Sequence, residues 1–270
     1  MPKYYLFDQY IPVDTQYTME PDKFLIIEKI GTNSSTAAKL VIGGAEVGAI
    51  NSTVAPLHKT SSNLLGPLDL GELYYVVPPN TKYKFTGASG SKMRLIGRIG
   101  VLSPGEAVPA AHMARYDQQN KIYLTYVEDT YNHGTDTAWV ADAEAEVYSL
   151  TPKTTEKYIF NNICMVAGSG DTISEGDFAV RFYLDGKVLD LLAKTAGKLG
   201  IDVKSMPRPP AATTEETPFT LKDLPIEVLG DHTLSVKIRN ISGSDKSPAS
   251  GSQWSFTFTA IVRYEFGGGT

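Results

Sequence analysis

The sequence predicts an all-β protein made of two tandem antiparallel β-sandwich modules, with one short helix in the second module. The composition is rich in strand formers and in turn formers, with 15 Tyr, 24 Gly and 16 Pro among 270 residues. Apolar and polar residues alternate along several segments, which is typical of strands with one buried face. The same order of strand and turn signals also occurs twice along the chain. These three observations together predict the fold class.

The first module is expected over residues 1–105. A Tyr-Thr-Met-Glu-Pro segment ending at Pro21 precedes its first strongly apolar strand. Gly43 and Gly44 suit a type I′ hairpin turn, because both central residues of that turn need positive φ. The strands are predicted at 24–30, on both sides of the turn within 39–50, within 71–85 and at 92–102.

A bridging segment is expected over residues 106–134, with its own strand at 121–127, and the second module over 135–270. A Tyr-Ser-Leu-Thr-Pro segment ending at Pro152 repeats the signal of the first module, and Asp185-Gly186 repeats its hairpin turn. Strands are predicted at 158–166, within 178–189, within 225–238 and at 253–266. The residues predicted to face the core of the last two strands are Leu234, Val236, Ile238, Trp254, Phe256, Phe258, Ala260 and Val262.

Two segments of the second module depart from the strand pattern. Residues 188–199 place apolar side chains at helical spacing and end before Gly200, which predicts the short amphipathic helix. Residues 206–218 are rich in Pro and Thr and have no periodicity, so they are interpreted as a surface loop that orders against a neighbouring subunit.

Charge and targeting signals narrow the class of protein. The net charge of -5 and the absence of a basic stripe argue against direct, sequence-specific nucleic-acid binding. The first residues contain no apolar run of signal-peptide length, which predicts synthesis in the cytoplasm. Cys164 is the only cysteine, so the chain has no intrachain disulfide, and its apolar neighbours predict an inert core thiol.

Residues capable of chemistry form no persuasive constellation. The four histidines lie far apart without metal-ligand spacing, and none is predicted to bind a metal: His58, His112, His133 and His232. His133 and His232 are interpreted as ordinary loop residues. Asp171, Glu175 and Asp177 depart from the spacing of a calcium loop. We therefore predict no catalytic, cofactor-binding or metal-binding residue, no cofactor, and no enzyme activity.

The strand, hairpin and predicted helix at Phe178–Leu192, in a chain with two tandem sandwich modules, resemble the double jelly-roll major capsid proteins of icosahedral viruses, which commonly enclose an internal membrane. The resemblance is one of architecture over the whole chain. It implies jelly-roll-like modules, a homotrimeric capsomer that self-assembles into a shell, other capsid proteins as partners, proximity to a membrane, and location in a virion. It also implies that loops 51–71 and 204–224 contact neighbouring subunits.

Three alternatives remain open from the residues. If the chain is a structural subunit, apolar faces around Tyr4, Tyr5 and Phe7 should contact partner chains. A carbohydrate- or receptor-binding adhesin would instead expose a cluster of aromatic residues, for which the candidates are Tyr116, Tyr123, Tyr126 and Tyr131. A subunit of an extracellular filament is a related structural alternative. A hydrolase would use the paired carboxylates Glu144 and Glu146, which alternate with small residues on one strand.

Overall fold

The computed structural model describes residues 1–50, 58–60, 63–64, 68–168, 173–189, 200–206, 219–220 and 225–267. The chain divides into two compact units, one built mainly from Met1–Tyr126 and the other mainly from Val127–Pro209 and Thr217–Val262. Each unit is described by itself below. Most of the described chain is strand, and four antiparallel sheets form two sandwiches, which confirms the predicted fold class.

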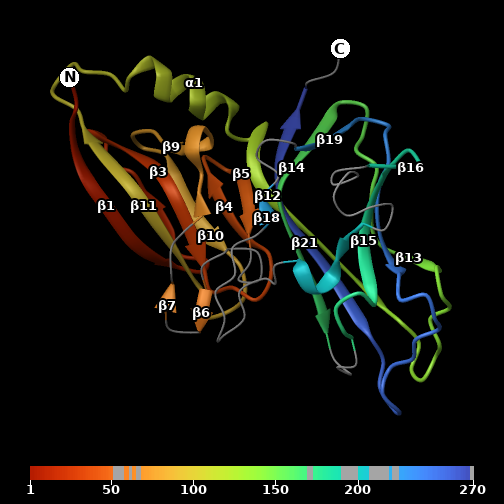
Figure 1. Cartoon of the computed structure of the whole chain (residues 1–270). Helices are drawn as coiled ribbons and strands as arrows, with labels where there is room; N and C mark the ends of the chain where they lie inside the picture. Colours follow the sequence, from red (N-terminus) through yellow and green to blue (C-terminus); the bar gives the residue numbers. More distant parts are fainter. Residues whose placement is uncertain are drawn as a thin grey trace. The chain divides into compact units, whose positions relative to one another are not determined.

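The first unit contains two sheets that face each other (Figure 1). One sheet has the order β1-β11-β3-β8, with β9 also paired to β3, and the other has the order β2-β10-β4-β5. Their bounds are β1 Lys3–Pro12, β2 Gln16–Thr18, β3 Lys23–Thr32, β4 Ala38–Ile42, β5 Ala45–Ile50, β8 Leu68–Asp69, β9 Tyr75–Val77, β10 Lys82–Thr86 and β11 Lys92–Val101. A small hairpin of β6 (His58–Thr60) and β7 (Asn63–Leu64), a 3-10 turn η1 (Gly71–Leu73) and a helix α1 (Ala110–Gln118) complete its described elements.

The second unit repeats this plan. One sheet has the order β12-β21-β14-β18, with β19 also paired to β14, and the other has the order β13-β20-β15-β16, with β17 also paired to β15. The bounds are β12 Ile122–Asn132, β13 Glu144–Leu150, β14 Glu156–Gly168, β15 Phe178–Leu184, β16 Lys187–Val188, β17 Ile201–Asp202, β18 Phe219–Thr220, β19 Ile226–Leu229, β20 Leu234–Asn240 and β21 Ser255–Phe266, with a 3-10 turn η3 at Val203–Ser205. The segment expected to bridge the modules, 106–134, contains α1 and β12.

The strand order of both units is that of an eight-stranded jelly roll. If β8 and β9 share one position, as do β18 and β19, the main strands of each unit number one to eight along the chain. One sheet then reads 1-8-3-6 and the other 2-7-4-5, in both units. This is the arrangement of two sheets joined by Greek-key connections. The internal repeat seen in the sequence is therefore a repeat of topology.

The repeat extends to individual turns. Asn80 and Asp231 precede β10 and β20, have φ of 59° and 66°, and both are non-glycine residues in the left-handed region. Each N–H group donates to a carbonyl in the segment between the second and third main strands of its unit, that of Met19 or that of Pro152, at 3.0 Å in both cases. The predicted hairpin turn at Gly43-Gly44 lies between β4 and β5 as expected, with φ of 60° and 87°. Its counterpart at Asp185-Gly186 lies between β15 and β16, with φ of 51° and 74°.

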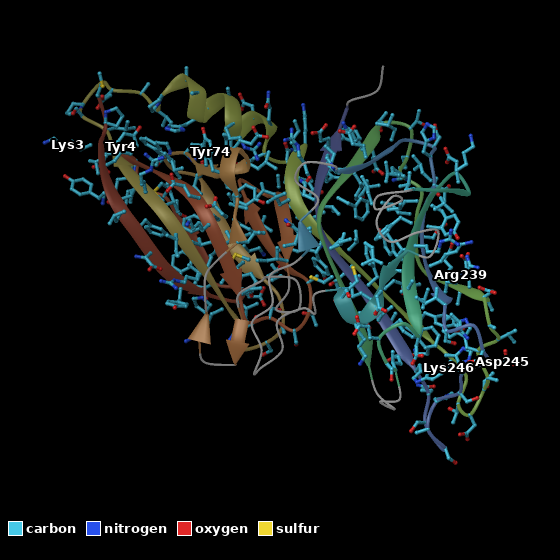
Figure 2. All side chains as sticks on the ribbon, in the orientation of Figure 1. Lys3, Tyr4, Tyr74, Arg239, Asp245 and Lys246 are labelled. Atoms are coloured by element: carbon cyan, nitrogen blue, oxygen red, sulfur yellow. The ribbon has the colours of Figure 1, made fainter. Side chains whose placement is uncertain are left out.

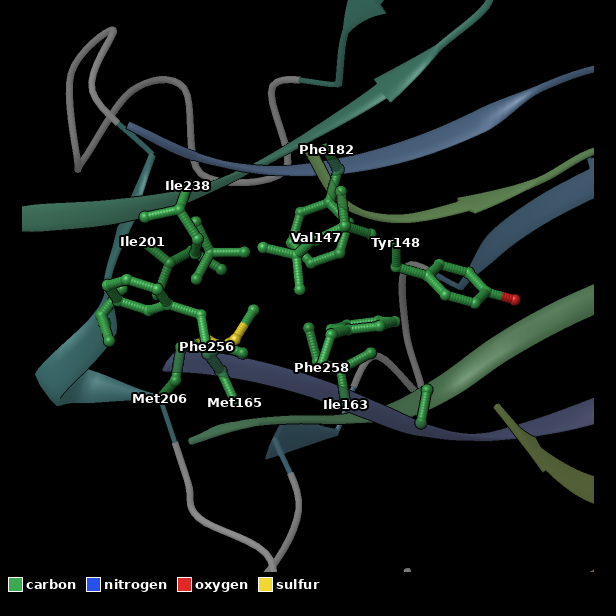
Figure 3. Close-up of a cluster of buried hydrophobic side chains, with 14 of the residues drawn as sticks. Val147, Tyr148, Ile163, Met165, Phe182, Ile201, Met206, Ile238, Phe256 and Phe258 are labelled. Carbon is green, nitrogen blue, oxygen red and sulfur yellow. The ribbon is translucent and has the colours of Figure 1, made fainter. Parts of the chain in front are cut away.

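The core of the second unit lies between its two sheets (Figure 3). All the residues predicted to face it from β20 and from the segment 254–262 are buried, with at most 1% of each side chain exposed. Phe178 contacts the rings of Trp254 and Phe256 edge-on at 5.1 and 5.5 Å, which adds directional stabilisation to the burial. The opposite face of β21 departs from the prediction, because Thr259 and Ile261 are also buried there.

Helix α1 was not predicted, because its attachment to the first unit is polar. Arg115 is buried and donates from Nε to the carbonyl of Tyr74 at 2.9 Å and from Nη2 to those of Leu73 and Ile122 at 3.1 and 2.9 Å. Gln119 accepts from the N–H of Val76 at 2.8 Å and donates to its carbonyl at 3.1 Å, so its amide pairs with β9 as a strand would. Such a helix lacks the apolar periodicity on which sequence-based assignment depends.

The helix predicted in the second module falls largely outside the described residues. Val188 belongs to β16, and 190–199 are not described. The same holds for most of the loop predicted at 206–218. Among the described helices, none has the length and apolar character needed to cross a membrane.

Candidate interaction surface

The first strand, β1, carries the exposed apolar residues expected of a contact surface. Tyr4, Tyr5 and Tyr10 are 40%, 55% and 51% exposed, and Leu6 is 93% exposed. Phe7 was expected on this surface, but it is 9% exposed and faces the core. The exposure of Tyr4 and Tyr5 is confirmed, whereas Leu6 was missed, although it has the largest exposed fraction of any apolar side chain within this strand.

Successive residues of β1 alternate between an outward face and a face turned toward the core. Tyr4, Leu6, Asp8 and Tyr10 share this face, because successive strand residues point to opposite sides of the sheet. In the antiparallel register, Leu6 lies opposite Arg98 of β11 and Tyr10 lies opposite Arg94. Directly opposed residues share a face. We call these six residues the β1 surface: Tyr4, Leu6, Asp8, Tyr10, Arg94 and Arg98.

Ion pairs and ring contacts fix the two arginines of the β1 surface. Arg94 binds Asp8 through two parallel hydrogen bonds, Nε to Oδ1 at 2.8 Å and Nη2 to Oδ2 at 2.6 Å, and lies 5.5 Å from the centre of the Tyr10 ring. Arg98 donates to Glu28 at 2.6 Å and lies 5.7 Å from the ring of Tyr4. The hydrogen bond from Arg94 lowers the pKa of the Asp8 carboxyl below its usual value. Side chains held in this way lose less conformational entropy when a partner binds.

A group of aromatic rings lies beside Tyr4 on the same face of the sheet. Its ring contacts Phe24 edge-on at 5.9 Å, and Phe24 lies 5.8 Å from the His112 ring of α1. Gly100, opposite Tyr4, permits this packing, because a Cβ at that position would lie 2.3 Å from the Phe24 ring. His112 accepts or donates a 3.1 Å hydrogen bond with the hydroxyl of Tyr74, and burial together with the charge of Arg98 lowers its pKa. Figure 2 shows Lys3 and Tyr4 at the start of β1, and Tyr74 near α1.

The backbone of β1 adds a second property to this surface. Within the described part of the chain, β1 pairs with β11 on one side and with no strand on the other. A ten-residue edge strand presents a row of N–H and C=O groups that can pair with another chain. Exposed Tyr and Leu, fixed Arg and an open strand edge form a surface suited to protein–protein contact, since Tyr and Arg are enriched at the centres of interfaces.

The carboxylates considered for hydrolysis are arranged differently from a glycosidase pair. Glu144 accepts hydrogen bonds from Arg181 at 2.7 Å and from the hydroxyl of Tyr183 at 2.6 and 2.7 Å. Burial and then the hydrogen bond to Glu144 raise the pKa of Tyr183 to about 12. Glu146 lies on the same strand as Glu144, β13, and is opposite Lys237 of β20. A glycosidase needs two acids that flank the scissile bond. Glu144 and Glu146 instead lie two residues apart on one strand, and Glu144 forms an ion pair with Arg181.

Three of the four histidines have side chains that the structure describes, and each of the three has a different set of partners. The described residues contain no group of three or more His, Cys, Asp or Glu side chains that could hold a metal ion. His232 pairs with Asp185 at 2.7 Å in an exposed turn, and the side chain of His58 lies outside the described residues. His133 is not an ordinary loop residue as predicted: it is 9% exposed and stacks on Trp139 at 4.7 Å, because its ring completes the aromatic core.

The remaining candidates are likewise used within the fold. Asp177 is 5% exposed and binds Lys246 at 2.8 Å, while Asp171 lies outside the described residues. Cys164 is buried, as predicted.

The four tyrosines proposed as an aromatic platform do not form an exposed cluster. Each is half-buried. Tyr123 contacts the ring of Tyr264 at 4.9 Å, and Tyr131 contacts Trp139 edge-on at 5.6 Å. Tyr116 stands on α1, close to the Gly43 turn. The platform therefore has no counterpart in the structure, although Tyr116 lines a cavity that is described below.

Comparison with known proteins gives a weak structural similarity to viral capsid proteins. No protein-family model and no curated protein sequence matches the chain. Among solved structures, the PBCV-1 virus capsid quasi-atomic model is 11% identical with a TM-score of 0.33, over 99% of this chain and 96% of that one. PBCV-1 VP54, fitted into a reconstruction of the virophage Sputnik, is 12% identical with a TM-score of 0.32, over 99% and 96%. A conserved protein of unknown function from Pseudomonas aeruginosa PAO1 is 8% identical with a TM-score of 0.22, over 97% and 80%. Each TM-score is below 0.5, so the fold assignment above rests on the strand order.

Proposed function

We propose that this chain is a non-enzymatic structural subunit of a virus particle, a major capsid protein that self-assembles into capsomers and a shell. The observation that carries the proposal is the repetition of one jelly-roll strand order in two units of a single chain. The jelly roll is an architecture of viral capsid domains, and also of lectins and cupins. The β1 surface favours the first of these, because it offers a contact area for another protein chain.

Two modules per chain suit a shell in a simple way. Three copies arranged around a threefold axis place six similar sandwiches in a ring, which approximates a hexagonal tile. Contacts between neighbouring tiles then extend the assembly beyond one ring and can close it into a shell. In this proposal the homotrimer is the building block, the virion is its location, and other capsid proteins and an underlying membrane are its neighbours.

The net charge sets a condition on assembly. At pH 7 the chain carries a formal charge of -5, so copies repel one another at low ionic strength. At about 0.15 M salt the screening length is ~8 Å, which leaves short-range contacts at the β1 surface to decide the outcome. We expect assembly to increase with salt between low and physiological ionic strength.

The test is assembly of the purified full chain as a function of concentration. Size-exclusion chromatography with light scattering should show a trimer, and negative-stain electron microscopy at high concentration should show tiles or closed shells. A monodisperse monomer at every protein and salt concentration would overturn the proposal. Fibrils of uniform width would replace it with the filament subunit.

A further inference from the structure

The first unit contains an open cavity of about 430 Å³ beside the Gly43-Gly44 turn. Small-molecule sites usually have volumes of about 300–1,000 Å³. Residues from β2, β4, β10, α1 and two turns line it, which makes it a product of the tertiary fold. Its polar lining includes Gln16, Asn80, Thr81, Lys82, Lys84 and Tyr116.

The charge of this cavity is one-sided. Lys82 and Lys84 lie on the outward face of β10, and no carboxylate is among the lining residues. Neither lysine forms an ion pair with any residue that the structure describes. An anion placed there would meet two ammonium groups and no carboxylate among the described lining residues.

The rest of the lining suits a hydroxylated ring. The side-chain amides of Gln16 and Asn80 can each donate and accept hydrogen bonds. The hydroxyl of Thr81 donates to the carbonyl of Pro79 at 3.3 Å and can accept a hydrogen bond from a ligand. Tyr116 and Val41 supply apolar surface against which one face of a ring can pack. This mixture of neutral donors, neutral acceptors and apolar surface is what a sugar requires, whereas a bare inorganic anion would use the lysines alone.

The equivalent turn in the second unit carries a side chain where this one has none, Asp185 in place of Gly43. Gly43 donates to the carbonyl of Lys82 at 2.8 Å, as Asp185 donates to that of Thr233 at 2.9 Å. The Asp185 side chain then binds His232 at 2.7 Å. Gly43 has no side chain, and a Cβ there would lie 2.7 Å from the hydroxyl of Tyr116.

A second cavity of about 220 Å³ shares Gly43 and Tyr116 with the first. Its lining includes Asp117 and no lysine, so it is less favourable to an anion than the first cavity. A ligand that extends from one cavity into the other would therefore place its charged unit between the two lysines and a neutral unit beside Asp117.

We propose that the cavity beside the Gly43-Gly44 turn binds an anionic sugar, as the terminal unit of a glycan whose next unit lies beyond Tyr116. The anionic group, a carboxylate or a sulfate ester, binds Lys82 and Lys84. This ligand site goes beyond the structural role proposed above, which requires no ligand.

Ligand-observed NMR titration of the full chain tests this proposal. The probes are sialyllactose for a carboxylate, sulfated lactose for a sulfate ester, lactose as the neutral control, and inorganic phosphate as competitor. We expect saturable binding of at least one of the two charged sugars and at least tenfold weaker binding of lactose. The charged sugar that binds more tightly identifies the anionic group.

The variant pair Lys82→Gln with Lys84→Gln should weaken binding of the charged sugar at least tenfold, because it removes both charge-assisted contacts to the anionic group. Lys187→Gln, the same change of charge at an exposed strand position of the second unit, should leave binding unchanged. Both proteins should assemble like the unmodified chain, so failure here is distinct from failure of the structural proposal. Absence of binding by both charged sugars at millimolar concentration would overturn the site. Equal binding by the lysine variant, or displacement by an equal concentration of phosphate, would do the same.

Discussion

Replacing Leu6 with lysine tests whether the β1 surface drives assembly. The Leu6 side chain is 93% exposed, so nearly all of its apolar area is available to a partner. Burying a whole leucine side chain contributes about 1.5–3 kcal/mol. Leu6→Lys removes that contribution and adds a charge, so we expect self-association to weaken roughly 10- to 100-fold, at about 1.4 kcal/mol per tenfold.

The measurement is the protein concentration at half-maximal light scattering, for the unmodified chain and for Leu6→Lys. Val140→Lys is the matched control, because Val140 is 57% exposed in the other unit. Neither change should alter the free energy of unfolding by more than about 0.5 kcal/mol, since both positions are on the surface. If Leu6→Lys assembled at the same concentration as the unmodified chain, β1 would not be the contact surface.

Three further predictions concern stability and ionisation. Phe256→Ala should lower the free energy of unfolding by about 3–5 kcal/mol in urea denaturation. Phe266 is 51% exposed on the same strand, so Phe266→Ala should lower it by under about 1 kcal/mol. Equal losses for the two variants would contradict the assigned register. Glu144→Gln should lower the pKa of Tyr183 from about 12 toward its ordinary value, without reaching it because burial persists, as measured by ultraviolet titration against a phenylalanine variant. The pKa of Asp8 is lowered in the folded chain, so its stabilising effect is present above about pH 4 and is lost as the pH falls through the folded value. The difference in melting temperature between the unmodified chain and Asp8→Asn should therefore disappear at the lowest pH, and a difference that grew on acidification would show the sign to be wrong.

The strands were predictable because the sequence signals that define them are local. The alternation at Leu234, Val236 and Ile238 indicates which side of β20 is buried. The paired glycines indicate where a hairpin turns. The repeat of these signals then supplied the two modules. The pairing order of the strands was not available from the residues, because it depends on contacts between segments far apart in the chain.

The features that were missed depend on tertiary contacts. Helix α1 attaches through Arg115 and Gln119, whose role as hydrogen-bond donors to distant carbonyls leaves no periodic signal. His133 lies in a turn-rich stretch, yet its ring stacks in the aromatic core. Leu6 and Phe7 are adjacent and equally apolar in sequence, so only the direction of the sheet face shows that one is exposed and the other is buried.

The amide of Gln119 has a consequence for the direction in which the first unit can recruit another chain. It forms hydrogen bonds with both the N–H and the carbonyl of Val76, the middle residue of the three-residue strand β9. The backbone groups on the outer edge of that strand are therefore already paired. The edge formed by β1, on the opposite side of the same sheet, is not paired in this way among the described residues. Growth of this sheet by strand addition is thus blocked at β9 and permitted along β1, which gives the first unit a polarity that a symmetric sandwich would lack.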